Sequence, residues 1–390
     1  MEYNFSTSMF IGETSQGIPM PVFFDLHTPI FNDKPPGVLI TGQPGSGKSY
    51  LAMTLTAMSA ILGKTTVVLD PKGDFISLMN LQKDIGAFNL WNLSDKKRRG
   101  LLDPFRMSAD PGEQLDLAMT VIELFTGGID GGQRTALAPI IKDVIQNPNP
   151  SLGKVVQELR GSQRQEARDL GTTLDLIASL PLAGLCFAPA GAHLESVSID
   201  KGLTVVTLVG MEMPKEGGKD NKSRLSTGIL FLLTDFIRRL MIKDDSRTPK
   251  TLVIDEAWAI LQTPAGAQVV KEVALLGRSK NLAMLLVTQN NSHLQHLDIE
   301  NTITTRFAFA SSGKEADSII NDMKLPEGEG FEGLITSLGK GECLMKDFTE
   351  RYSTVQISSW RKEWDYAFKT NPLEKARQEQ AKAKAAAAQG

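Results

Sequence analysis

The chain has 390 residues, a length that allows two domains or one large α/β domain with an insertion. Its hydrophobic content of 41% can form a substantial core, and its net charge of −3 gives no bulk support for non-specific wrapping of nucleic acid. Two cysteines far apart in sequence, Cys186 and Cys343, favour the reduced, buried thiols of a cytoplasmic protein over a disulfide scaffold.

The first hundred residues alternate between strand and helix patterns. Residues 10–24 (FIGETSQGIPMPVFF) place two apolar pieces around a Ser-Gln-Gly turn and predict a β-hairpin. Apolar runs at 37–42 and 65–70 predict buried parallel strands, with a helix at 49–62 between them. This βαβ pattern predicts a parallel sheet with helices on both faces. We find no signal peptide and no apolar run long enough to span a membrane.

The segment GQPGSGKS at 42–49 matches a phosphate-binding loop at every fixed position and lies between a predicted strand and a predicted helix. Its glycines allow a tight backbone curl that directs amide groups at an anion. Lys48 is expected to reach the β- and γ-phosphates, and the Ser49 hydroxyl to bind Mg²⁺. The predicted nucleotide-binding residues are Gly42, Gln43, Pro44, Gly45, Ser46, Gly47, Lys48, Ser49 and Tyr50.

Helix patterns dominate from about residue 108 to 200, with helices expected at 112–126, 132–146 and 163–180. Strand patterns return at 203–210, 251–255, 282–287 and 306–310, followed by 341–347 and 352–358. We therefore predict an α/β fold with an all-α insertion subdomain. The expected divisions are a hairpin and the first part of the core at 1–107, the insertion at 108–200, the rest of the core at 201–360, and a C-terminal helix and tail at 361–390.

The segment TLVIDEAW at 251–258 is an apolar strand that ends in two acids. Burial of two carboxylates is costly unless a cation or water compensates it. Asp255 is expected to hold Mg²⁺, and Glu256 to act as the general base on the attacking water. A general base for hydrolysis argues against a small-molecule kinase. The sequence also lacks the [NT]KxD motif that recognises guanine, which argues against a Ras-type GTPase. The long separation between Lys48 and Asp255 agrees with the predicted helical insertion.

The segment LGRSKNLAMLLVTQN at 276–290 places an apolar strand between Arg278 and Gln289. We expect this strand beside the phosphate-loop strand, with Gln289 at the ligand-binding carboxyl end as a sensor of γ-phosphate or water. A simple strand-capping role for Gln289 is the alternative. Arg278 precedes the strand, so it is expected at the opposite edge, where it could act on a neighbouring subunit's nucleotide. It could also be a surface arginine, and Arg306 is the rival candidate.

The ordered motifs DPKGDF (70–75), VIDEAW (253–258), GRSKN (277–281) and VTQ (287–289) follow the phosphate loop. Together they resemble the large cytoplasmic ATPase of type IV secretion and conjugation systems, within the FtsK/HerA superfamily. The resemblance implies a RecA-like ATPase core, ATP and Mg²⁺ as ligands, dimers or hexamers, and peripheral docking at an inner-membrane secretion channel. It supports the site residues above and adds Asp70 or Asp74 near the water or metal. Family members usually carry an N-terminal domain, so the chain is expected to be the motor half or a short natural form.

Two further segments leave alternatives open. His293 and His296 form an HxxH spacing with no third ligand nearby, which favours a polar helix start over a metal site. The basic segment at 215–224 is either a flexible surface loop or a pore loop that contacts a DNA or protein substrate. The leading function is an ATP-driven motor for secretion, conjugation or pilus assembly. The alternatives are a DNA translocase or coupling ATPase, and a non-hydrolysing scaffold whose assembly responds to nucleotide.

Overall fold

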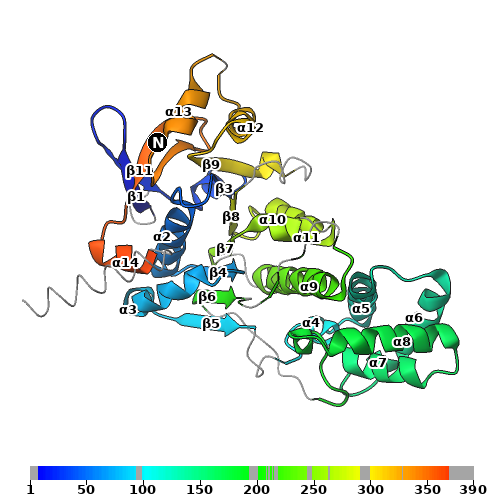
Figure 1. Cartoon of the computed structure of the whole chain (residues 1–390). Coiled ribbons are helices and arrows are strands. Elements are labelled where there is room, and N and C mark those ends of the chain that lie inside the picture. The colour runs from blue at the N-terminus through cyan, green and yellow to red at the C-terminus, as the bar shows by residue number, and fades with distance from the viewer. Residues whose placement is uncertain are drawn as a thin grey trace, which may run out of the picture.

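One mixed sheet organises the chain in the computed structural model (Figure 1). The structure describes residues 8–93, 99–192, 201–207, 209, 211–212, 214, 218–243, 248–261, 264–289, 299–326 and 328–368. Eleven described strands lie in the order β2-β1-β11-β10-β9-β3-β8-β7-β4-β6-β5. The predicted fold class, a parallel or mixed sheet flanked by helices with an all-α insertion, is confirmed.

The strands from β9 to β5 are all parallel. Their bounds are β9 Ile303–Phe309, β3 Gly37–Thr41, β8 Leu282–Thr288, β7 Lys250–Ile254, β4 Thr65–Asp70, β6 Gly202–Thr207 and β5 Phe88–Asn92. β8 lies between β3 and β7, where Leu285 is in register with Val38 on one side and Val253 on the other. The prediction that this strand lies beside the phosphate-loop strand is confirmed.

The remaining four strands extend the sheet in antiparallel fashion at the β9 edge. They are β10 Glu342–Lys346, β11 Tyr352–Ile357, β1 Met9–Thr14 and β2 Pro21–Phe24. β1 pairs with β2 and β10 pairs with β11, so the predicted N-terminal hairpin and the two predicted C-terminal strands are confirmed. β5, by contrast, was not predicted, since its sequence FNLWN shows no clear alternation.

Helices cover both faces because alternate strand residues point to opposite sides. Val38, Val68 and Val253 pack with α2 (Lys48–Ile61), η1 (Asp74–Leu81), α3 (Gln82–Ile85) and α14 (Asp365–Phe368). Leu39 and Leu252 pack on the other face, with α9 (Asn221–Lys243), α10 (Ala257–Leu261) and α11 (Pro264–Leu276). A third cluster joins β9 and β10 to α12 (Lys314–Met323) and α13 (Phe331–Ser337). The short helices are α1 Thr28–Phe31, α4 Pro104–Met107, η3 Ala183–Leu185, η5 Glu300–Thr302 and η6 Lys362–Trp364.

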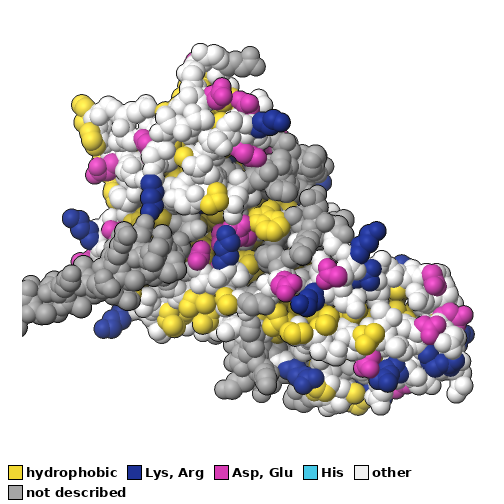
Figure 2. Space-filling model, viewed as in Figure 1, with side chains coloured by type: hydrophobic (Ala, Val, Ile, Leu, Met, Phe, Trp, Pro, Cys, Tyr) yellow, Lys and Arg dark blue, Asp and Glu magenta, His cyan; other side chains and the backbone are white. Residues whose placement is uncertain are grey.

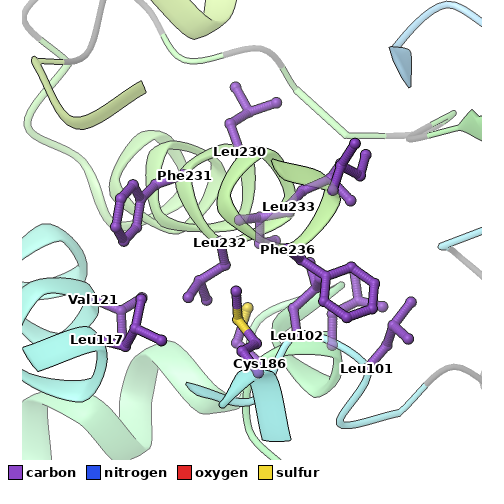
Figure 3. Packing of buried hydrophobic residues seen from close by; sticks show 14 of the residues in the cluster. Leu101, Leu102, Leu117, Val121, Cys186, Leu230, Phe231, Leu232, Leu233 and Phe236 are labelled. Atoms are coloured by element: carbon purple, nitrogen blue, oxygen red, sulfur yellow. The ribbon is translucent and has the colours of Figure 1, made fainter. Parts of the chain in front are cut away.

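The predicted helical segment contains α5 (Pro111–Thr126), α6 (Gly131–Ile145), α7 (Leu152–Gly161) and α8 (Gln165–Ala178). They form the lobe at the lower right of Figure 1, next to α9. Figure 3 shows Phe231 of α9 over Leu117 and Val121 of α5, while Leu232 points toward Cys186 and Phe236 lies near Leu102. The lobe and the sheet therefore share a continuous hydrophobic core through α9. The domain boundaries at 108 and 200 remain predictions.

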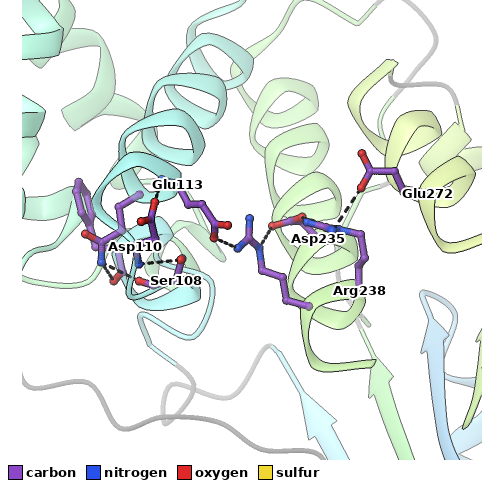
Figure 4. A network of polar contacts seen from close by, with 9 residues as sticks. Ser108, Asp110, Glu113, Asp235, Arg238 and Glu272 are labelled. Atoms are coloured by element: carbon purple, nitrogen blue, oxygen red, sulfur yellow. Dashed lines mark hydrogen bonds and ion pairs between the residues drawn. The ribbon is translucent and has the colours of Figure 1, made fainter. Parts of the chain in front are cut away.

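Charged side chains tie the lobe to the core through α9 (Figure 4). Arg239 bonds Glu113 of α5 and Asp235, and Arg238 bonds Asp235 and Glu272 of α11. The network thus joins α5, α9 and α11. Asp235 is buried, and both arginines pair with its carboxylate, so its negative charge is balanced.

Asp103 is a second tie between the lobe and the core. Its fully buried carboxylate accepts hydrogen bonds from the backbone amides of Phe105, Leu152 and Ala188, at 3.2, 2.9 and 3.0 Å. It therefore joins the first turn of α4, the first turn of α7 and the segment after η3. Within the described residues, no helix combines the length and apolarity needed to cross a membrane.

Asp103→Ala is expected to destabilise the fold by at least about 3 kcal/mol, because three buried amides lose their acceptor at ~1–3 kcal/mol each. Chemical denaturation measures this loss. Asp110→Ala is the matched control, since Asp110 caps α5 through a single exposed amide bond to Glu113, and it should cost about 1 kcal/mol. Equal losses for the two variants would contradict the role of Asp103 as a three-way tie.

Candidate functional site

The predicted site residues gather at one edge of the sheet. The parallel strands β3, β8, β7 and β4 are consecutive neighbours, so their carboxyl ends lie at the same edge. The phosphate loop follows β3, Gln289 follows β8, and Asp255 and Glu256 follow β7. Asp70 is the last residue of β4. The tertiary structure therefore brings together segments that are up to 247 residues apart, from Gly42 to Gln289 (289 − 42).

The phosphate loop has a backbone shape that only glycine adopts easily. Gly47 precedes α2 with φ 119°, and a Cβ there would lie 3.0 Å from the Cα of Gly341. Gly42 has φ 145°, and its Cβ would lie 2.6 Å from the Cβ of Phe309. The neighbouring strands hold the loop from outside: the Gly341 amide donates to the Ser46 carbonyl at 2.8 Å. The loop is therefore tightly packed on β9 and β10.

Lys48 is the first residue of α2 and is buried. Its ammonium group donates to the carbonyls of Gly42 at 2.6 Å and Gln43 at 2.8 Å, so it folds back over the loop. Burial lowers the pKa of Lys48 to about 8; Lys72 acts in the same direction, while Glu256 opposes it. An anion next to this ammonium group would compensate its desolvation. The loop and Lys48 thus fit a phosphate group.

Glu256 lies in the sharp turn between β7 and α10, with a left-handed φ of 53°. Its carboxylate accepts a hydrogen bond from Gln289 Nε2 at 3.0 Å and further bonds from Lys72 Nζ and Trp258 Nε1. Burial acts to raise the pKa of Glu256, but the bonds from Lys72 and Gln289 outweigh it and hold the pKa below its ordinary value. The site therefore keeps this carboxylate ionised.

Asp255 is buried beside Glu256, and its backbone amide donates to the Leu69 carbonyl of β4 at 3.0 Å. Burial raises the pKa of Asp255 to about 7, and the nearby carboxylates of Asp70 and Glu256 add to the effect. A cation here would relieve this concentration of negative charge. Asp255 and the half-buried Ser49 supply the oxygen ligands that Mg²⁺ prefers, so these residues fit the metal.

Asp70 has a structural contact that the sequence analysis did not expect. Its carboxylate oxygens accept hydrogen bonds from the backbone amides of Gly73, Asp74 and Phe75, at 2.8, 3.2 and 2.8 Å. These bonds shape the DPKGD loop and begin η1. The same loop carries Lys72, so Asp70 anchors the backbone from which Lys72 reaches Glu256.

Lys72 and Trp258 are site residues that the sequence analysis missed. Both lie within quoted motifs, DPKGDF and VIDEAW, but the spacing of these motifs does not indicate a contact with Glu256. Tyr50 was predicted to bind nucleotide, and its side chain has other partners: its hydroxyl donates to Asp365 at 2.5 Å and its ring packs on Phe368. The part of Tyr50 that lies next to the phosphate loop is therefore its backbone, in the first turn of α2.

The two candidate arginines differ in their surroundings. Arg278 lies just before β8, at the opposite edge from Gln289, and 55% of its side chain is exposed. It donates to the Asp33 carbonyl at 2.9 Å. Arg306 has a side chain that is 14% exposed and is paired with Asp322 through two hydrogen bonds, at 2.7 and 3.1 Å. Arg278 is therefore the freer of the two. His293 and His296 lie outside the described residues, as do residues 215–217 of the basic segment.

This geometry defines the class of the protein: a P-loop NTPase fold in which an additional strand separates the phosphate-loop strand from the strand that carries the acidic pair. The sequence profile of the AAA-like domain family matches residues 32–368. The chain belongs to that family.

The chain is also similar in sequence to a curated bacterial protein. The chain is 23% identical over 366 residues to the uncharacterized protein YddE of Bacillus subtilis (strain 168), covering 86% of this chain but 43% of YddE. It therefore spans less than half the length of that curated relative.

The fold is similar to that of VirB4 of Thermoanaerobacter pseudethanolicus, with a TM-score of 0.75 and 17% identity, covering 94% of this chain and 100% of that one. The plasmid coupling protein TrwB in complex with a non-hydrolysable ATP analogue gives a TM-score of 0.60 at 16% identity, covering 93% and 91% of the two chains. TrwB in complex with ADP and Mg²⁺ gives 0.58 at 17% identity, with 90% of each chain covered. The resemblance drawn from the motifs is thus confirmed at the level of the fold.

Proposed function

We propose that the protein is a Mg²⁺-dependent ATPase of the catalytic-glutamate class. The observation that carries this proposal is the direct contact between Glu256 and Gln289 at the carboxyl edge of the sheet. Glu256 follows β7, and Gln289 follows β8, which lies between β7 and the phosphate-loop strand β3. A buried, ionised carboxylate next to a phosphate loop is suited to accept a proton from water. The solved TrwB complexes with an ATP analogue and with ADP and Mg²⁺ support the choice of ligands.

Each residue has a distinct role in the proposed reaction. The loop amides and Lys48 bind and orient the phosphates. Ser49 and Asp255 would hold Mg²⁺, which supplies positive charge that offsets the phosphate oxygens. Glu256 takes the proton from the attacking water. Gln289 holds Glu256 through its hydrogen bond and positions the water next to it. Because Gln289 directly follows β8, a shift of its amide would be transmitted to a central strand of the sheet.

We further propose that hydrolysis drives substrate transfer or pilus assembly by a type IV secretion or conjugation machine, at the inner face of the membrane. The ordered motifs and the VirB4-like fold support this role. A DNA translocase or coupling ATPase is the second candidate, supported by the TrwB-like fold. Figure 2 shows acidic and basic side chains interspersed over the helical lobe, a surface less suited to a phosphate backbone than a continuous basic one.

Phosphate release from ATP by the purified protein, with and without Mg²⁺, tests the ATPase. Addition of single- or double-stranded DNA separates the two candidate roles. Stimulation by DNA that weakens as salt rises would favour the DNA translocase or coupling ATPase. Binding of ATP with no phosphate release under any of these conditions would instead indicate a nucleotide-controlled assembly scaffold.

We propose that Arg278 acts on the nucleotide of a neighbouring subunit in a dimer or hexamer. Arg278→Ala is expected to lower turnover by ~10³-fold or more, because an arginine finger contributes about that factor. Mixing Arg278→Ala with Lys48→Ala subunits should restore part of the ATPase activity, since each variant supplies what the other lacks. Arg361→Ala is the control, because Arg361 is a surface arginine stacked on Trp360. A lack of recovery at every mixing ratio would contradict action between subunits.

A further inference from the structure

Three protein donors contact the carboxylate of Glu256. One of its oxygens, Oε1, accepts from both Lys72 Nζ and Gln289 Nε2, while Oε2 accepts from the indole N–H of Trp258. Lys72 contributes the only one of these three donors that carries a charge. A general base must have an oxygen lone pair directed at water. In this arrangement Lys72 and Gln289 compete with water for Oε1.

Lys72 and Glu256 differ in how firmly the fold holds them. The Glu256 side chain is 8% exposed and sits in a constrained turn, whereas the Lys72 side chain is 49% exposed. The backbone under Lys72 is fixed, because Asp70 binds the amides of Gly73, Asp74 and Phe75. The flexible four-carbon stem of a lysine can therefore change partner while its loop stays in place.

The charge of Lys72 also reaches the phosphate-loop lysine. Its positive charge acts to lower the pKa of Lys48, while Glu256 acts to raise it, so both ammonium groups lie within electrostatic range of the same carboxylate. Burial acts to lower the pKa of Lys72, but the bond to Glu256 and the charges of Asp255 and Asp74 outweigh it and raise the pKa. A group with several negative charges that binds between these two lysines competes with Glu256 for Lys72.

We propose that Lys72 holds Glu256 in the nucleotide-free protein and transfers to the terminal phosphate when ATP binds. This inference rests on the proposed ATPase function of the same site. The transfer frees Oε1 of Glu256 for water only when a γ-phosphate is present. Lys72 is thus a further substrate-contacting residue, which distinguishes ATP from ADP and limits the access of water to Oε1 to the ATP-bound state.

The test is a binding cycle that needs no turnover. Equilibrium dialysis or calorimetry measures the affinity for a non-hydrolysable ATP analogue and for ADP, with Mg²⁺, in the wild type, Lys72→Met, Glu256→Gln and the double variant. Lys72→Met should weaken analogue binding by about tenfold, since a charge-assisted hydrogen bond is lost, and should leave ADP binding within about twofold. Lys72→Arg should retain most of the preference for the analogue.

Glu256→Gln removes the charge that competes for Lys72. It should therefore strengthen analogue binding by about fivefold, and this gain should disappear in the double variant. Lys83→Met, which changes an exposed lysine of α3, is the matched control and should change neither affinity. Thermal denaturation of each variant checks that it folds.

Two results would overturn the transfer. One is an equal loss of analogue and ADP affinity in Lys72→Met. The other is the same gain from Glu256→Gln whether or not Lys72 is present. Failure of the proposed ATPase is distinguishable, because it appears as binding of the analogue without phosphate release from ATP by the wild type. The binding cycle remains informative in that case.

Discussion

Lys48→Ala is expected to reduce ATP turnover by at least about 100-fold, because loss of one preorganised donor to a reacting oxygen has an effect of that size. The contacts of Lys48 indicate that this substitution removes the cation without disturbing the fold. Lys48 is buried, its ammonium group contacts only loop carbonyls among the described hydrogen bonds, and its desolvation is costly in the free protein. Removal of this cation should therefore leave the fold intact, or stabilise it slightly.

Phosphate release and nucleotide affinity should both be measured for Lys48→Ala, next to thermal denaturation. A loss of affinity together with turnover assigns Lys48 to phosphate binding, and unchanged affinity with low turnover assigns it to the reaction step alone. Lys83→Ala changes an exposed lysine on α3 and should behave as the wild type. Wild-type turnover by Lys48→Ala would remove the phosphate loop from the proposed site.

Glu256→Gln is expected to lower turnover by ~10²–10⁴-fold, the usual contribution of a general base, while nucleotide still binds. The amide has nearly the shape of the carboxylate and can still accept from Trp258 or Gln289, but it cannot take a proton from water. Loss of activity without loss of binding is the result that separates a catalytic glutamate from one that only shapes the pocket.

Single-turnover phosphate release measures this effect, because it excludes slow product dissociation as the cause. Glu332→Gln, an exposed change on α13, is the control and should leave turnover unaltered. If Glu256→Gln hydrolyses ATP as fast as the wild type, the assignment of the catalytic-glutamate class is wrong, whereas the fold and the phosphate loop are unaffected.

Local patterns were sufficient for much of the fold and for the main site residues. The phosphate loop, the acidic pair and Gln289 each follow an apolar strand, and the parallel arrangement of those strands requires their ends to meet. The motifs also predicted that β8 lies beside β3, whereas its second neighbour, β7, is known only from the structure. β5 was missed because FNLWN mixes polar and apolar residues without a clear period.

The side-chain contacts within the site could not be predicted from the sequence. Lys72 and Glu256 are separated by 184 positions, and their pairing depends on the neighbouring positions of β4 and β7 in the sheet and on the loop that Asp70 holds. Asp103 likewise joins Leu152 and Ala188, which only packing of the helical lobe brings to it.

The sequence by itself determined which chemical groups stand at strand ends, because motif spacing and strand patterns are properties of short segments. Only the tertiary structure decided the partners of those groups, because a hydrogen bond depends on distances of a few tenths of an ångström between distant segments. Glu256 illustrates both. Its place after β7 follows from the chain, whereas its bonds to Lys72, Gln289 and Trp258 follow from the fold.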